Sequence, residues 1–191
     1  VWSTTHVAVE RAGLHAGCQM LVHTAAGGVG LKAVEYAQWL CASSIGTAGQ
    51  QHKHRLLRAT AAGSLCSSRD GAAFTVGLMR LHVARRWHMV LNSLSLDFIA
   101  VSFASLGEGG SFAEIGKRGI WAAARHASAT PSTAYCAIAL DADVALEPLW
   151  MHGVLSLLTT RASHVAVTSL PLQSFDMVLQ HELAFRTLQN G

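Results

Sequence analysis

Short apolar runs of strand length alternate along the chain with amphipathic stretches of helical length, which is the pattern of βαβ units. Strands are predicted at residues 19–24, 43–48, 65–67, 87–92 and 110–116. Helices are predicted between them at residues 29–40, 54–62, 72–83 and 98–106. The alternation predicts an α/β fold, a Rossmann-type doubly wound parallel sheet with helices on both faces.

A second block begins at Pro131, the first proline of the sequence. Its pattern predicts a strand at 134–140, a helix at 145–159, a strand at 164–168 and a helix at 175–188. The sequence starts within a helical stretch and stops without a closing strand. We therefore expect residues 1–191 to form one nucleotide-binding domain, cut from a larger protein and without its final strand or strands.

Composition limits the class of protein. Of the 191 residues, 51% are hydrophobic and only 13% are charged, so the chain is able to bury a core. The net charge of +3 is small and the cations are scattered, which argues against nucleic-acid binding. No stretch could span a bilayer, and the four cysteines lack the spacing of a metal site. We expect a cytoplasmic protein with reduced thiols, no membrane association and no metal.

The segment Ala25-Ala-Gly-Gly-Val-Gly30 lies between a predicted strand and a predicted helix. It matches the dinucleotide fingerprint, with Ala25 in the first glycine position, followed by Gly27 and Gly30. The second glycine lets the backbone approach a pyrophosphate, and the third lets the helix pack on the strand. Free N–H groups and the positive end of the helix dipole then face the phosphates. A glycine motif alone also fits a tight turn, but its context favours a dinucleotide site.

Charge near the end of the second predicted strand indicates which nucleotide binds. NAD-preferring sites place an acidic residue there to hold the ribose 2′-OH, whereas residues 45–53 contain no acid. Thr47 is able to hydrogen-bond a phosphate, Lys53 offers a positive charge, and Arg69 offers a bidentate partner. The pattern favours NADPH over NADH, although each cation alone also fits a solvated surface charge.

Three segments resemble the signatures of one family, in the same order and with the same separations. They are Leu21-Val-His-Thr-Ala-Ala-Gly-Gly-Val-Gly30, Val90-Leu-Asn-Ser-Leu94 and Phe112-Ala-Glu-Ile-Gly-Lys117, and the late segment Ala184-Phe-Arg-Thr-Leu-Gln189 agrees with them. They resemble enoyl-reductase domains of polyketide synthases, in the quinone-reductase-like branch of the medium-chain dehydrogenase/reductase superfamily. The resemblance covers nearly the whole chain.

The resemblance implies a fold and an activity. Members of the family combine a GroES-like catalytic domain with a Rossmann domain, and this chain covers the Rossmann part. The implied reaction is NADPH-dependent 1,4-reduction of a trans-2-enoyl thioester carried on an acyl carrier protein, beside other synthase domains in the same polypeptide. Because one wall of the substrate cleft belongs to the catalytic domain, we expect the 191 residues alone to be inactive.

The resemblance also implies ten cofactor-binding residues. Those assigned to the pyrophosphate turn are Gly27, Gly28, Val29 and Gly30. Those assigned to the adenosine 2′-phosphate are Thr47, Lys53 and Arg69. Those assigned to the nicotinamide ribose, at the end of a predicted strand, are Asn92, Ser93 and Leu94.

One catalytic residue is implied, and its surroundings depart from the family. Lys117 matches the lysine proposed in the family to assist protonation. The family usually carries an Asp in the next strand, whereas Ala139 occupies that position here and Asp141 lies two residues further on. On an extended strand this offset moves the carboxyl group by about 6–7 Å. Two alternatives stay open beside an active enoyl reductase: a stand-alone quinone oxidoreductase, and a degenerate domain with a structural role.

Overall fold

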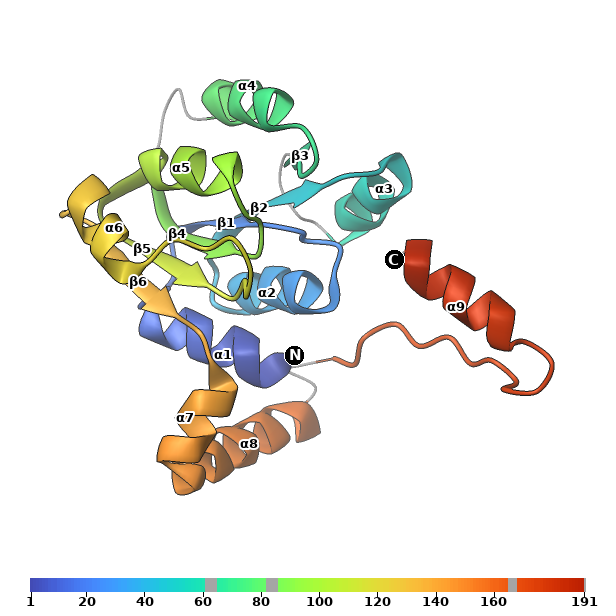
Figure 1. The fold of residues 1–191 in the computed structure, drawn as a ribbon. Coiled ribbons are helices and arrows are strands. Elements are labelled where there is room, and N and C mark those ends of the chain that lie inside the picture. The colour runs from blue at the N-terminus through green and yellow to red at the C-terminus, as the bar shows by residue number, and fades with distance from the viewer. Residues whose placement is uncertain (61–64, 82–85, 165–167, 191) are drawn as a thin grey trace.

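The computed structural model describes residues 1–60, 65–81, 86–164 and 168–190. Its centre is a six-stranded sheet with the order β3-β2-β1-β4-β5-β6, in which all neighbouring strands are parallel (Figure 1). The strands are β1 (Gln19–Val22), β2 (Ser43–Ala48), β3 (Leu65–Ser67), β4 (Trp87–Asn92), β5 (Leu106–Glu114) and β6 (Ala134–Ala137). The strand order reverses its direction between β1 and β4, so the predicted Rossmann-type fold is confirmed.

Helices cover both faces of this sheet. Those among the described residues are α1 (Trp2–Arg11), α2 (Gly28–Trp39), α3 (Gln51–Ala59), α4 (Gly71–Leu81), α5 (Asp97–Ala104), α6 (Ala123–Ala129), α7 (Leu140–Leu146), α8 (Pro148–Ser163) and α9 (His181–Asn190). In Figure 1, α1 and α2 lie on one side of the sheet, and α4 and α5 lie on the other. The pair α7 and α8 continues on the side of α1, whereas α9 extends away from the sheet.

Side chains that alternate along the central strands fill a core on each face. On β1, Met20 and Val22 belong to the core that packs against α1 and α2. Leu21 between them belongs to the second core, together with Val90 of β4 and residues of α4 and α5. The two central strands are therefore buried on both faces, as parallel strands between two helix layers have to be.

The first five predicted strands are confirmed with small changes at their ends. The bounds of β2, β3 and β4 match the prediction, and β1 ends earlier at Val22. β5 begins four residues earlier, at Leu106, and ends two residues earlier, at Glu114. The four helices predicted between them correspond to α2, α3, α4 and α5. The predicted ends of two of these helices, at 61–62 and 82–83, lie outside the described residues.

The second block differs more from its prediction. β6 ends at Ala137 and α7 begins at Leu140. The prediction of a strand at 134–140 was therefore wrong for its last three residues. The single helix predicted at 145–159 is in fact two helices. Glu147 takes an extended backbone conformation (φ −144°, ψ 82°) before Pro148, and Pro148 then begins α8. This break follows from the steric restriction that proline places on the preceding residue.

The remaining segments of this block are α6, residues 164–168 and the last helix. α6 was not predicted. The strand predicted at 164–168 falls largely on residues 165–167, which lie outside the described residues. The last helix was predicted from residue 175, but α9 begins at His181 because Asp176 first forms a turn. Its carboxylate accepts the N–H groups of Val178 and Leu179, both at 2.9 Å.

Gly30 sets the distance between α2 and β1. A Cβ at this position would lie 2.5 Å from Ala25 Cα and 2.6 Å from the carbonyl oxygen of Thr24. Both are backbone atoms, so neither is free to move aside as the tip of a side chain could. This is the close helix–strand packing that the sequence predicts for the third glycine of the motif.

We expect Gly30→Ala to lower the free energy of unfolding by about 1–3 kcal/mol, because the added methyl group overpacks the turn. Urea denaturation of the two proteins measures this difference. The matched control is Gly153→Ala in α8, where a Cβ would have no neighbour within 4 Å and stability should not fall. An unchanged unfolding midpoint for Gly30→Ala would contradict the packing argument.

Candidate nucleotide-binding site

A cleft of about 250 Å³ lies at the carboxyl ends of β1, β2 and β3. It is bordered by the turn after β1, the end of β2, the first turn of α3 and the loop after β3. The residues that line it are Thr24, Ala26, Gly27, Thr47, Ala48, Gly49, Gln50, Lys53, Ser68 and Arg69. Ligands of open parallel sheets bind at this edge, beside the point where the strand order reverses.

The turn between β1 and α2 forms one wall of the cleft. Thr24 has a left-handed backbone (φ 48°), and its carbonyl accepts the N–H of Gly27 at 2.8 Å. Gly27 is the N-cap residue of α2, and no side chain caps this helix end. The first N–H groups of α2, at Gly28, Val29 and Gly30, have no acceptor within the helix. An anion beside this helix end would receive hydrogen bonds and a favourable dipole.

A buried series of hydrogen bonds supports this turn from behind. Thr47 Oγ1 accepts the N–H of Thr24 at 3.0 Å and lies 3.3 Å from His23 Nδ1. His23 Nε2 lies 2.7 Å from Ser102 Oγ in α5. Thr47 was expected to bind the 2′-phosphate. It lines the cleft, but its side chain is fully buried and its hydroxyl group already positions the turn. Its contact with a phosphate stays a prediction.

His23 takes part in these bonds as a neutral imidazole. Complete burial lowers its pKa to about 3. Each ring nitrogen lies within hydrogen-bond distance of a hydroxyl group, and in a neutral imidazole one nitrogen donates while the other accepts. This role of His23 was not predicted from the sequence. A polar residue between an apolar strand and a glycine turn is the signal that would have found it.

Two cations line the cleft near the end of β2. Lys53 comes from the first turn of α3, and Arg69 comes from the loop after β3. Among the described residues, neither cation has an ion-pair partner and no Asp or Glu lines the cleft. The structure thus brings Lys53 and Arg69 together with Gly27, as the sequence predicts.

A buried carboxylate joins the loops after β4 and β5. Glu114 accepts a hydrogen bond from Asn92 Nδ2 and another from the N–H of Gly116, both at 2.7 Å. Burial raises the pKa of Glu114, and these two hydrogen bonds oppose the rise. Asn92 was expected to line the nicotinamide ribose. Its side chain is fully buried and holds the loop, because it also bonds the N–H and the carbonyl of Leu94. Its place beside a ribose stays a prediction.

The loop after β4 also meets the phosphate turn. Ser93 Oγ lies 2.6 Å from Thr24 Oγ1, and both Ser93 and Leu94 are half-buried. Further along, Gly119 has a left-handed backbone (φ 62°), and a Cβ there would lie 3.1 Å from Ser95 Cβ. The loops after β1, β4 and β5 therefore converge where the strand order reverses.

Lys117 follows β5 at the same edge, and its ammonium lies 3.7 Å from Asp141 Oδ2. A strand extended through residue 141 would have carried this carboxylate away from the position of Ala139. The chain instead turns into α7 at Leu140, which brings Asp141 beside Lys117. Both side chains are exposed, so the ion pair adds little to stability. The offset expected for an extended strand does not apply, because Asp141 lies in a helix, where its carboxylate stands next to this lysine.

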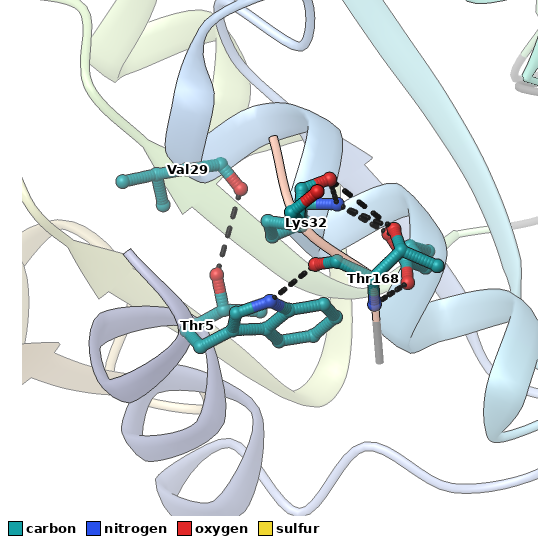
Figure 2. A network of polar contacts seen from close by, with 7 residues as sticks. Thr5, Val29, Lys32 and Thr168 are labelled. Carbon is teal, nitrogen blue, oxygen red and sulfur yellow. Dashed lines mark hydrogen bonds and ion pairs between the residues drawn. The ribbon is translucent and has the colours of Figure 1, made fainter. Parts of the chain in front are cut away.

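A late segment of the chain, residues 168–170, crosses α2 beside the phosphate turn (Figure 2). Lys32 Nζ donates to Glu35 at 2.7 Å, to Thr168 Oγ1 at 2.8 Å and to the carbonyl of Ser169 at 2.9 Å. Glu35 also accepts the N–H of Thr168 at 2.8 Å, and Trp2 Nε1 donates to the Thr168 carbonyl at 2.9 Å. Burial acts to raise the pKa of Glu35, but the bonds from Lys32 and Thr168 lower it.

The 168–170 segment also limits the space around the turn. A Cβ on Gly28 would lie 3.2 Å from Leu170 Cδ1 and 3.6 Å from Val1 Cγ2. From the other side, Thr5 of α1 donates to the carbonyl of Val29 at 3.5 Å (Figure 2). These neighbours leave little room for a side chain at Gly28, so the first turn of α2 presents bare backbone.

Metal-binding clusters and membrane-spanning helices are two features that the part of the chain described by the structure lacks. No three His, Cys, Asp or Glu side chains there are grouped as a metal ion would require. Among the described helices, none combines the length and the apolar character needed to cross a membrane.

Known proteins with similar sequences are large synthases. No protein-family model matches the chain. It is 34% identical over 199 residues to a highly reducing polyketide synthase of Aspergillus terreus, covering 100% of this chain and 8% of that protein. It is 44% identical over 115 residues to the hybrid PKS-NRPS synthetase pyvA of Aspergillus violaceofuscus, covering 59% of this chain and 3% of that protein. The chain thus spans less than a tenth of either relative.

Solved structures agree with these sequences. The CurK enoyl reductase is 29% identical and has a TM-score of 0.88, with 99% of this chain and 56% of that chain covered. The nucleotide-binding subdomain of the enoylreductase domain of PpsC from Mycobacterium tuberculosis shares the fold at 24% identity. Its TM-score is 0.77, and the match covers 89% of this chain and 98% of that chain.

The sheet order, the glycine turn and the cleft define a nucleotide-binding domain of the Rossmann type. The similar proteins describe the chain more closely. In sequence it is similar to polyketide synthases, and in sequence and structure it is similar to their enoyl-reductase domains, as the sequence motifs indicated.

The buried His23 should make stability depend on pH. Because folding lowers its pKa from 6.5 to about 3, the unfolded chain binds more protons as the pH falls below 6.5. The contribution of His23 to the free energy of unfolding is therefore complete above pH 6.5. It is lost at about 1.4 kcal/mol per pH unit as the pH falls towards 3.

Urea denaturation at pH 7.5 and pH 5.5 tests this dependence with His23→Gln as the comparison. The variant should be less stable at pH 7.5, but it should lose about 1.4 kcal/mol less between the two pH values. Burial also lowers the pKa of His6 and of His126, and their effects cancel because both proteins contain them. Equal losses in the two proteins would rule out His23 as a source of the pH dependence.

Proposed function

We propose that this chain is the nucleotide-binding half of an NADPH-dependent enoyl reductase that acts within a polyketide synthase. One observation carries the proposal: a single cleft joins the phosphate turn to Lys53 and Arg69, and no acidic residue among the described ones lines it. The similarity to CurK supports the same activity, since the CurK structure is that of an enoyl reductase.

The residues present fit NADPH. The free N–H groups of Gly28, Val29 and Gly30 would bind its pyrophosphate, and bare backbone at Gly27 would allow close approach. The adenosine 2′-phosphate would then lie between Lys53 and Arg69, further along the same cleft. A phosphate needs cations there, whereas a free 2′-OH is usually held by a carboxylate.

The proposed reaction is reduction of a trans-2-enoyl thioester carried on an acyl carrier protein. When bound, NADPH supplies a hydride to the β-carbon. The electron pair of the double bond then moves towards the thioester carbonyl as an enolate, and the α-carbon needs a proton. We assign that proton to the ammonium of Lys117, which becomes a neutral amine as the saturated thioester forms.

Asp141 acts on the reaction through Lys117. Its carboxylate, 3.7 Å from the ammonium, orients the lysine before proton transfer. Ser93 and Leu94, at the adjacent end of β4, are proposed to line the nicotinamide ribose. Ser93, Leu94 and Lys117 follow the carboxyl ends of β4 and β5, and Asp141 follows that of β6. This is the edge of the sheet that the phosphate turn shares.

We further propose that a second domain completes the catalytic cleft. The chain corresponds to 56% of the CurK enoyl reductase, so that enzyme has residues beyond the matched part. Lys117 and Asp141 are both exposed in this domain. A covering domain would expel water and strengthen the interaction of Lys117 with the developing enolate.

The chain should prefer NADPH to NADH. Removing one charge-assisted contact to the 2′-phosphate costs about 1.5–3 kcal/mol, so Lys53→Ala should weaken NADPH binding about tenfold or more. NADH binding should change little. Fluorescence titration of the two nucleotides measures both affinities.

Arg55→Ala is the matched control, because Arg55 belongs to the same helix but does not line the cleft. It should keep the preference for NADPH. Equal affinities of the unaltered chain for the two nucleotides would remove the argument for a 2′-phosphate site.

Binding and turnover should be separable. The 191 residues should bind NADPH but not oxidise it with crotonyl-pantetheine thioester, because a hydride acceptor has to be held about 3–3.5 Å from the nicotinamide. A polypeptide that also includes the proposed catalytic domain should oxidise NADPH with this substrate. Loss of NADPH absorbance measures both reactions. Turnover by the 191 residues alone would contradict the proposed division into two domains, and turnover with quinones in place of thioesters would contradict the proposed substrate.

A further inference from the structure

The side chain of Arg69 lies directly over the backbone of Gly49, at the end of β2. A Cβ on Gly49 would lie 2.6 Å from Arg69 Nε and 2.8 Å from both its Cγ and its Cδ. No real Cβ tolerates such distances, so this placement of Arg69 requires a residue without a side chain. Both residues line the candidate 2′-phosphate cleft.

The backbone of Arg69 is held in place independently of this contact. Ser67 Oγ accepts the N–H of Arg69 at 3.2 Å and that of Asp70 at 3.1 Å. Asp70 in turn accepts the N–H of Ala73 in the first turn of α4 at 2.9 Å. Ser67 itself is paired with Ala48 between β3 and β2. Only the side chain of Arg69 is therefore free to change its position.

Gly49 has no conformational reason to be glycine. Among the described residues, the glycines with left-handed backbone are Gly13, Gly17, Gly109 and Gly119, and Gly49 is not one of them. An alanine could adopt its backbone conformation without strain. What an alanine would meet is the flexible part of one exposed side chain, which can swing away at little cost to the fold.

We propose that Gly49 is a specificity-determining residue: it provides the surface on which Arg69 rests, and so directs the guanidinium towards the 2′-phosphate. The inference rests on the proposed NADPH site and adds a residue that contacts no phosphate itself. A guanidinium binds phosphate through a planar pair of donors, so its orientation matters more than that of an ammonium. Gly49 would thus act on nucleotide preference entirely through Arg69.

A double-mutant cycle tests this dependence. The proteins are the unaltered chain, Gly49→Ala, Arg69→Ala and the double variant, and the measurement is the ratio of the NADPH and NADH affinities by fluorescence titration. Arg69→Ala should lower this ratio about tenfold or more, as expected for a lost charge-assisted contact. Gly49→Ala should lower it by a similar factor, and the double variant should behave as Arg69→Ala does.

Gly153→Ala is the matched control, because it makes the same substitution in α8, far from the cleft and with no neighbour within 4 Å. It should leave the affinity ratio unchanged. Urea denaturation of Gly49→Ala shows whether the fold is kept, and a midpoint close to that of the unaltered chain is expected.

The outcomes separate the inference from the proposed function. If Arg69→Ala lowers the ratio but Gly49→Ala does not, the inference is wrong and the NADPH site stands. If the effects of the two variants add, Gly49 acts by another route and the inference is again wrong. If neither Lys53→Ala nor Arg69→Ala changes the ratio, the proposed 2′-phosphate site itself is wrong, and the inference is wrong with it.

Discussion

The junction between β1 and α2 is the constraint on which the other parts of the structure depend. At Gly30, α2 approaches β1 so closely that one methyl group would meet the backbone of Ala25. This approach points the first turn of α2 at the cleft. It also places Thr24, whose N–H bonds to β2 and whose hydroxyl reaches the loop after β4. The backbone of Thr24, Ala25 and Gly30 therefore takes part in the sheet, in one helix layer and in the cleft. A change at this junction should affect both the stability of the domain and the binding of a nucleotide.

Polar side chains buried behind this junction determine the shape of the loops in front of it. His23 and Thr47 support the phosphate turn, whereas Glu114 and Asn92 support the loops after β4 and β5. In an apolar interior each of these groups has to be hydrogen-bonded, so each holds its loop in one conformation. The groups left to meet a ligand are backbone N–H groups and the cations at the rim. The site thus separates the residues that give it shape from those that would bind.

Periodicity predicted β1 to β5 well because strands buried between two helix layers have to be apolar. The same reasoning failed after residue 137, since the end of β6 depends on contacts between distant residues. One of them is the ion pair of Arg11 with Asp143, 2.8 Å long, which joins α7 to α1. The types of residue were enough to predict Lys53 and Arg69 at the cleft. They were not enough for Gly49, because its role depends on which atoms face each other across two neighbouring strands.

The contacts of the 168–170 segment with α2 have a consequence for the order in which the site is assembled. Lys32 and Thr168 are 136 residues apart in the sequence, so their contact closes a long loop. During synthesis the N-terminal part of a chain emerges first. β1 and α2 therefore leave the ribosome while Lys32 and Glu35 can bond only to each other and to water. The phosphate turn is made long before Thr168, so its surroundings are complete only after that residue has followed.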